Sequence, residues 1–371
     1  MFYFIIFSIL ALFALLEMVV MPGKTRKAAY IALSVGFIIM GSLRWHTGND
    51  WKPYFNFFTT FTTDNPYFLI AMEPGFTQFV KFLRFFSNNF TFYLTVLSIL
   101  TIGIKAAFFY EYAGAVFLAA ILYWGTNLSD IIAVRQSLAI SLCLLSTHFI
   151  ILKKPWYFVI MVFIAAQIHI TSYIFIFSYF VYHARWSVGY KVFFLFLSLA
   201  IGSLSVSQNL LQIVVDYTPS GIGLDRLNDK AQSYMESGNE VNYGNNLSKT
   251  QRLIAAIFKR AILLPIFFYF QEKLTIYEDK YKGFLNLYTF GNILFFLVID
   301  FLTLQRIASY FYIFEILLFC ILFVNVRSKS IWLIIIIGYS LFKLISIIVN
   351  AQHLLVPYIW IFSDNLDRYV Y

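Results

Sequence analysis

Three arginines stand at the edges of long apolar stretches in this chain of 371 residues. Arg44 directly follows one stretch, Arg135 lies about one turn into another, and Arg306 comes at the end of a third. An arginine at the centre of a membrane helix costs about 2.5–3.5 kcal/mol, so such side chains need partners or a wet cavity. Because the guanidinium fork matches phosphate in two-point contact, the arginines indicate an anionic ligand such as a lipid-linked phosphate or diphosphate. Ion pairs with Asp130 and Asp300, or a purely topological role, are the alternatives.

Two carboxylates and one imidazole could take up a proton near these arginines. Asp50 follows Gly48, whose turn could fold the carboxylate back toward Arg44. Glu73 precedes a Pro-Gly turn, so it could cap a helix, act as a general base or bind a sugar hydroxyl. His169 lies inside an apolar run, where an ionisable residue suggests a functional site. A hydrogen bond between helices is the alternative for His169.

The sequence carries no sign of a metal or nucleotide cofactor. No cluster of His, Cys and carboxylates has metal-ligand spacing. The chain also lacks a phosphate-binding loop and a lipase nucleophile elbow. Cys143 and Cys320 each lie inside an apolar run and imply no disulfide framework. We therefore expect no cofactor.

The composition predicts the elements that must position these residues. Hydrophobic residues make up 61% of the chain and charged residues 12%, against roughly half and a quarter in soluble domains. The apolar runs are long enough for membrane helices and too uniform for barrel strands. We predict an all-α polytopic membrane protein of one domain, residues 1–371, with about ten transmembrane helices. Its apolar runs lie at 2–21, 28–43, 90–110, 113–128, 131–152, 156–183, 189–207, 253–270, 284–304, 307–326 and 331–349.

The loop charges predict an orientation. The net charge of +9 does not indicate nucleic-acid binding, because Lys and Arg collect in the cytoplasmic loops of membrane proteins. Placing the five basic turns inside puts the N-terminus outside, together with loops 44–89 and 208–252. In the first of these loops, residues 76–86 are typical of a short interfacial helix. The second is polar and is expected to be a mobile loop.

The apolar run 156–183 is predicted to be broken. As a single span it would place its two basic flanks on opposite sides. Two half-length helices that meet near Gln167 and His169 would keep both flanks inside. Each half is about 18–20 Å long at 1.5 Å per residue, too short to cross about 30 Å of hydrocarbon. Such a break is tolerated only inside protein or beside a polar cavity. A single long tilted span is the alternative.

Several short motifs follow one another in a recognisable order. They are Arg44-x3-Gly48-x-Asp50-x3-Tyr54, Glu73-Pro74-Gly75-Phe76, Arg135-Gln136-Ser137-Leu138-Ala139, His169 with Thr171, Arg306 with Tyr310, and Pro357-Tyr358. In this order on a polytopic scaffold, the chain resembles the EpsG family of Wzy-type polysaccharide polymerases over nearly its whole length. The loop 208–252 has no matching motif.

The resemblance implies a glycosyltransferase of the C type in the bacterial inner membrane, making O-antigen or exopolysaccharide. Such an enzyme joins repeat units carried on undecaprenyl diphosphate at the periplasmic face, with no metal. The growing chain is the donor, and a new lipid-linked repeat is the acceptor. A chain-length regulator and a flippase are the expected protein partners.

The same resemblance assigns roles to the candidate residues. The arginines would stabilise the leaving diphosphate, and one of the three candidate bases would deprotonate the acceptor hydroxyl. Trp51, Tyr54 and Gln136 would contact substrate sugars, and Tyr310 would join them beside Arg306. The alternative for the aromatic residues is a membrane-interface belt.

Three other activities stay open at this point. An O-antigen ligase would use the same donor with a lipid A core acceptor. A lipid-linked oligosaccharide flippase would favour internal repeats and charges along a central path, and the sequence has neither. A membrane acyltransferase could also use His169.

Overall fold

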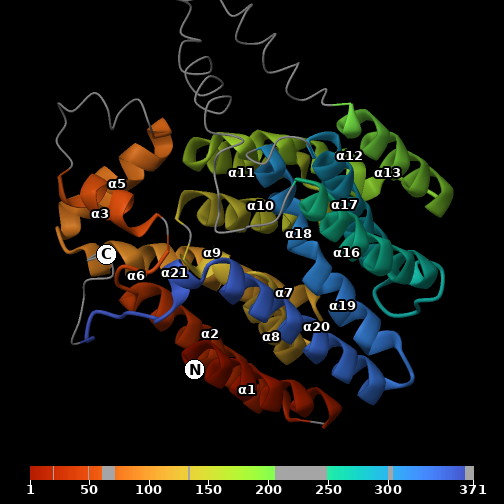
Figure 1. The fold of residues 1–371 in the computed structure, drawn as a ribbon, viewed down its shortest axis with the longest axis horizontal. Coiled ribbons are helices and arrows are strands. Elements are labelled where there is room, and N and C mark those ends of the chain that lie inside the picture. The colour runs from red at the N-terminus through yellow and green to blue at the C-terminus, as the bar shows by residue number, and fades with distance from the viewer. Residues whose placement is uncertain are drawn as a thin grey trace, which may run out of the picture. The chain divides into compact units, whose positions relative to one another are not determined.

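The computed structural model describes residues 1–19, 21–48, 50–60, 72–132, 134–204, 249–299 and 304–363. Within these ranges the chain is helical, and no strand is formed (Figure 1). One isolated antiparallel bridge joins Arg44 and Trp360. The prediction of an all-α protein is therefore confirmed.

The chain divides into two compact units, Met1–Ile176 with Ile316–Tyr371, and Phe177–Glu315. The helices of the first unit are α1 (Phe2–Leu15), η1 (Leu16–Met18), α2 (Gly23–Leu43), α3 (Trp51–Thr59), α5 (Pro74–Phe86), α6 (Phe90–Ser98), the π-turn η2 (Ile99–Gly103), α7 (Ile104–Tyr112), α8 (Val116–Thr126), α9 (Leu128–Ile132), α10 (Arg135–Ile151), α11 (Pro155–Ile168), α20 (Lys329–Asn350) and α21 (Gln352–Leu355). Two helices cross the boundary between the units in sequence, η3 (Ile170–Phe177) and α19 (Phe314–Asn325).

The second unit is built around one helix. It comprises α12 (Ser178–His183), α13 (Val188–Ser203), α16 (Lys249–Phe270), α17 (Glu278–Leu297), η4 (Leu304–Ala308) and α18 (Ser309–Tyr312). The central α17 packs against α12, α13, η4 and α18. Close approach to α13 requires Gly202, because a Cβ there would lie 1.9 Å from the carbonyl oxygen of Phe296.

Four helices in the described part are long and apolar enough to cross a membrane. They are Gly23–Leu43, Phe90–Tyr112, Leu304–Asn325 and Lys329–Asn350. Other apolar helices, such as Val116–Thr126 and Pro155–Ile168, are shorter. The protein is thus a helical membrane protein, while the predicted number of about ten spans is not confirmed.

One of the shorter helices forms the core of the first unit. Every residue of α8 from Val116 to Gly125 is buried, as is typical of a helix that is apolar all round. The helix packs against α1 and α20. At its end, a Cβ on Gly125 would lie 2.4 Å from the carbonyl oxygen of Ser340. This close packing fixes the point where the chain turns into α9.

The predicted break in the run 156–183 is present. The helix α11 ends at Ile168, and His169 adopts an extended conformation with φ −151° and ψ 115°. A 3₁₀ helix, η3, follows. The 14 residues of α11 are too few to span about 30 Å of hydrocarbon. The α-helix is therefore interrupted at His169, where the sequence predicted the break.

The structure describes most of the predicted loop 44–89 but little of the predicted loop 208–252. A helix is present where an interfacial helix was expected at 76–86: it is α5, which begins two residues earlier. It buries Phe76, Val80 and Leu83, whereas Phe85 is 85% exposed. Its amphipathic pattern agrees with the interfacial prediction. The loop 208–252 lies almost entirely outside the described residues, and its last part is helical because α16 begins at Lys249.

Candidate functional site

Arg135 joins three elements of the first unit. Its Nη1 donates to Oε2 of Glu73 at 2.5 Å, and its Nε donates to the hydroxyl of Tyr54 at 2.5 Å. The Arg135 side chain is 21% exposed and that of Glu73 is 7% exposed. Charged hydrogen bonds of this kind are about twice as strong as neutral ones. The arginine is therefore bonded to two other elements while part of its side chain is exposed.

Arg135 lies at a helix start, and the prediction that it lies one turn into a span is wrong. The preceding residue, Val134, has φ −116° and ψ −86°, so α10 begins at Arg135 itself. The N-terminus of a helix carries a partial positive charge. The guanidinium and the helix dipole therefore favour negative charge at the same end of α10.

Glu73 bridges Arg135 to the break after α11. It occupies the N-cap position of α5, but its side chain forms no capping hydrogen bond. Its Oε1 instead accepts from the backbone N–H of Ile170 at 3.4 Å. Gly75 fits against the same break, because a Cβ there would lie 2.4 Å from Cβ of Gln167. The helix-capping alternative for Glu73 is therefore not the arrangement observed.

His169 is the extended residue of the break itself. Its Nδ1 lies 2.7 Å from the hydroxyl oxygen of Thr171, and the ring is half-buried. If Nδ1 carries the proton, then Nε2 has the lone pair that a general base needs. His169 is adjacent in sequence to Ile170, to which Glu73 bonds.

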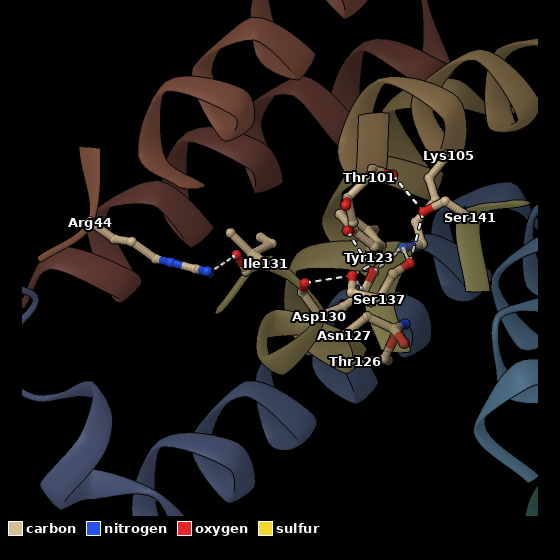
Figure 2. Close-up of polar contacts among 10 residues, drawn as sticks. All are labelled: Arg44, Thr101, Lys105, Tyr123, Thr126, Asn127, Asp130, Ile131, Ser137 and Ser141. Atoms are coloured by element: carbon tan, nitrogen blue, oxygen red, sulfur yellow. Dashed lines mark hydrogen bonds and ion pairs between the residues drawn. The ribbon is translucent and has the colours of Figure 1, made fainter. Parts of the chain in front are cut away.

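Arg44 is a deeply buried cation of this region, with 2% exposure. It caps the C-terminal end of α2. Its Nη1 donates to the carbonyl oxygen of Ile131 at 2.5 Å, as Figure 2 shows. Its Nε has no hydrogen-bond partner among the described residues. Burial lowers the pKa of Arg44 to about 10, so the group is still charged at neutral pH.

Asp50 lies close to this cation without bonding to it directly. Gly48 has φ +96°, a conformation that glycine adopts readily, and the turn leads into Asp50 at the N-cap of α3. The carboxylate acts electrostatically on both Arg44 and Tyr54. Asp50 itself is exposed to solvent. Asp50 therefore lies within electrostatic reach of Arg44, while the Arg44 side chain itself bonds to Ile131.

Tyr93 belongs to this region and was missed by sequence reasoning. Its side chain is 1% exposed, and its hydroxyl has no hydrogen-bond partner within the described ranges. The phenol lies within electrostatic reach of Tyr54, Arg44, Arg135 and Asp50. Nothing in the sequence distinguishes it from the other aromatic residues of the apolar run 90–110.

Two of the aromatic residues predicted to contact sugars, Trp51 and Tyr54, lie on α3 and are buried. Trp51 is 2% exposed and packs in an aromatic cluster with His46 and Phe55, with ring centroids 4.1 Å and 4.9 Å away. Tyr54 is 6% exposed, and burial raises its pKa to about 12. The Tyr54 phenol therefore stays protonated and accepts the hydrogen bond from Arg135.

The remaining predicted residues lie at other places. Gln136, the second residue of α10, is half-buried. Arg306 and Tyr310 belong to the second unit, where Arg306 is exposed on η4 and Tyr310 is buried in α18. The structure does not bring these two together with Arg135 within one unit. Asp300 lies outside the described residues.

Among the described residues, the ion-pair partner of Asp130 is a lysine and not an arginine. Its Oδ2 lies 2.6 Å from Nζ of Lys105, within the polar network drawn in Figure 2. Sequence reasoning overlooked Lys105, although a lone charge in the apolar run 90–110 was a usable signal. The prediction that no metal binds stays a prediction, since the absence of a group of three ligands holds only for the described part of the chain.

The comparisons with known proteins give one match. The sequence model of the EpsG family matches residues 27–360, which is nearly the whole chain. No curated protein matches the chain, and no solved structure does so.

Proposed function

The chain belongs to the EpsG family of Wzy-like polysaccharide polymerases, and we propose that it joins oligosaccharide repeats carried on undecaprenyl diphosphate. We place the reaction on the periplasmic face of the bacterial inner membrane. One observation carries the proposal. Two arginines from separate elements lie in one region of the first unit, and the buried one, Arg44, keeps its Nε unbonded to any described residue. Fixed donors of this kind suit a diphosphate.

The proposed chemistry requires stabilisation of the leaving group. When the acceptor hydroxyl attacks the anomeric carbon, the bond to the lipid diphosphate breaks and negative charge grows on the diphosphate. Preorganised donors directed at that charge lower the barrier. We assign this role to Arg135 and Arg44, with the Tyr93 hydroxyl as a further donor. Both arginines lie within electrostatic reach of the Tyr93 phenol.

Of the three candidate bases, His169 fits the task best. Glu73 already accepts from Arg135 and from the backbone N–H of Ile170. These bonds engage both of its carboxylate oxygens. Imidazole ionises near neutral pH, which is the range that favours general-base catalysis. We therefore propose His169 as the base and Glu73 as the residue that positions Arg135.

The other predicted residues are assigned to substrate contacts. The exposed carboxylate of Asp50 can accept hydrogen bonds from sugar hydroxyls. Gln136 offers an amide beside Arg135 for the same purpose. In the second unit, Arg306 presents an exposed guanidinium next to the turn that holds Tyr310, and we propose that these two bind the second lipid-linked substrate. Trp51 would act through its packing in the aromatic cluster around α3.

Two other activities are weaker candidates. An O-antigen ligase would need the same donor site, so only the acceptor separates it from a polymerase. A flippase needs charges along a path across the membrane, whereas Arg44, Arg135 and Glu73 gather in one region of the first unit. A chain-length regulator and a flippase remain proposed partners of the polymerase.

The direct test supplies lipid-linked repeats to the purified protein in nanodiscs and resolves the products by length. Wild-type protein is expected to give a ladder. His169→Ala should give unjoined repeats at normal protein levels, because loss of a general base costs about 10²–10⁴ in rate. Transfer of a single chain to a lipid A core, with no ladder, would favour the ligase. Repeats that move between leaflets without joining would favour the flippase.

The proposed face has a separate test. Cysteine in place of Ser220 is expected to react with a membrane-impermeant thiol reagent in spheroplasts, and cysteine in place of Lys280 is not. The native Cys143 and Cys320 are buried, so they should give little background. The opposite labelling pattern would place the proposed site on the cytoplasmic side and contradict the proposal.

A further inference from the structure

Lys105 and Asp130 form a buried ion pair in the first unit. Nζ of Lys105 lies 2.6 Å from Oδ2 of Asp130, and the side chains are 1% and 10% exposed. The Tyr123 hydroxyl donates to the same carboxylate oxygen at 2.8 Å. Oδ1 of Asp130 accepts from the Ser137 hydroxyl. Every oxygen of this carboxylate is therefore bonded, and the pair joins α7, α8, α9 and α10 (Figure 2).

The pair also binds the backbone at the start of α10. Nζ of Lys105 donates to the carbonyl oxygen of Ser137 at 3.1 Å, and the Ser137 hydroxyl lies 2.7 Å from the carbonyl oxygen of Asp130. Ser141 donates to the carbonyl oxygens of both Ser137 and Thr101. The short segment between Asp130 and Ser137 is thus held at both ends by one network.

Both arginines of the proposed site depend on this segment. The carbonyl of Ile131, the residue next to Asp130, is the acceptor for Nη1 of Arg44. Arg135 lies two residues before Ser137, as the first residue of α10. A shift of α9 would therefore move the acceptor of one arginine and the backbone of the other.

A buried ion pair is a weak stabiliser, because taking two charges out of water costs about as much as their attraction returns. Apolar residues of similar volume often serve stability equally well. The presence of this ion pair between four helices therefore needs a reason other than stability. Buried polar networks can fix the positions of the helices that they join. Here the fixed element is the segment that carries the arginine contacts.

We propose that the Lys105–Asp130 pair is a positioning device that locks α9 and the start of α10, and so holds Arg44 and Arg135 at the spacing a lipid diphosphate requires. The inference rests on the proposed function and deepens it by adding residues that touch no substrate. A displacement of about 1 Å at such a site can cost on the order of 10²-fold in rate. The pair thus acts on affinity and rate through the arginines.

The test uses a double variant that removes both charges. Single changes at Lys105 or Asp130 leave one buried charge unpaired and endanger folding, whereas Lys105→Met with Asp130→Asn removes both and should fold. We expect this variant to raise KM for the lipid-diphosphate donor, with kcat/KM lower by about 10²-fold. Loss of folded protein alone would lower kcat and leave KM unchanged.

A control comes from another ion pair of the first unit, Arg26 with Glu17, in which the Arg26 side chain is 33% exposed. Glu17 lies 2.8 Å from Arg26 and is 7% exposed. The double variant Arg26→Met with Glu17→Gln also removes both charges of an ion pair, here a partly buried one, and neither residue belongs to α9 or α10. It is expected to keep the wild-type KM. A KM that rises equally in both double variants, or in neither, would overturn the positioning role.

Hydrogen exchange separates this inference from the proposed function. Backbone amides of residues 128–138 should exchange faster in the Lys105→Met, Asp130→Asn variant than in the control variant. If wild-type protein makes no polymer, the proposed function fails, but exchange still decides whether the pair locks this segment. Unchanged exchange at 128–138 in a folded double variant would show that the pair positions nothing.

Discussion

The two arginines of the proposed site are held in opposite ways. Arg135 is paired with the carboxylate of Glu73 and the phenol of Tyr54, and part of its side chain is exposed. Arg44 is almost fully buried, and within the described residues its side chain donates to the backbone carbonyl of Ile131. A carboxylate neutralises a cation, whereas a carbonyl dipole only orients it. Arg135 is therefore a compensated charge, and Arg44 retains more of its field.

This difference assigns the two residues different tasks during a reaction. A compensated arginine can exchange its carboxylate partner for a substrate phosphate with little change in net charge. An arginine held by a carbonyl keeps its orientation throughout and adds a constant positive potential. We expect Arg135 to move between partners and Arg44 to stay in place.

Among changes to the two arginines and their neighbours, the largest effect is expected from Arg135→Lys. A lysine is a point charge and cannot bond to Glu73 and Tyr54 in the forked geometry. Loss of one such donor from a transition-state site typically costs about 10²–10³ in kcat, so polymer should disappear at normal protein levels. The assay is polymer length from membranes that contain equal amounts of protein.

Arg185→Lys is the control for this change, because Arg185 is exposed and lies outside the proposed site. It should give wild-type chain lengths. The same substitution at Arg306 tests the second unit, and we expect a loss of polymer there as well. Wild-type chains from Arg135→Lys would show that only the charge matters and would remove the argument from fork geometry.

A smaller effect is expected from Glu73→Gln. The amide keeps the shape of the side chain but loses its charge, so Arg135 loses its compensating partner. Hydrogen bonds to charged groups are worth about 1.5–3 kcal/mol, which corresponds to about 10–100-fold in kcat/KM. Because we assign Glu73 to positioning, the shape of the pH–rate profile should not change.

The pH profile distinguishes Glu73 from His169. Loss of the base should remove the acid limb of the profile, because that limb reports protonation of the base. His169→Ala should therefore flatten the limb, and Glu73→Gln should keep it. If Glu73→Gln flattens the limb instead, Glu73 is the base and the comparison between the two arginines must be revised.

The sequence predicted the helices better than the site. Apolar runs locate the described helices because hydrophobic burial, in protein or lipid, governs where helices form. The break at His169 was also predictable, since a polar residue in a run with two basic flanks leaves few arrangements. Each of these signals is local in sequence, and local signals are what a single sequence carries.

Only the charged residues of the candidate site could be predicted from the sequence. Arg44, Arg135 and Glu73 stood out because charges are rare in this chain, but their partners did not. The bond between Glu73 and Arg135 links residues 62 positions apart, and no spacing rule connects them. Tyr93 resembles any other aromatic residue until its unbonded hydroxyl is seen in three dimensions.

The smallest expected effect concerns Tyr93 and separates binding from stability. The buried Tyr93 hydroxyl has no partner among the described residues, and an unsatisfied buried group costs about 1–3 kcal/mol. Tyr93→Phe should therefore raise the free energy of unfolding by about 1 kcal/mol. The same change removes a hydrogen-bond donor for the diphosphate. KM for the lipid-diphosphate substrate should therefore rise by several-fold, which corresponds to about 0.5–1.5 kcal/mol.

Tyr3→Phe is the matched control, because the Tyr3 hydroxyl donates to the carbonyl oxygen of Leu355 at 2.8 Å. The control should lower stability and leave KM unchanged, both measured in the same nanodiscs. If Tyr93→Phe leaves KM unchanged, the Tyr93 hydroxyl does not bind the diphosphate. Arg44 would then bind it without a hydrogen bond from Tyr93.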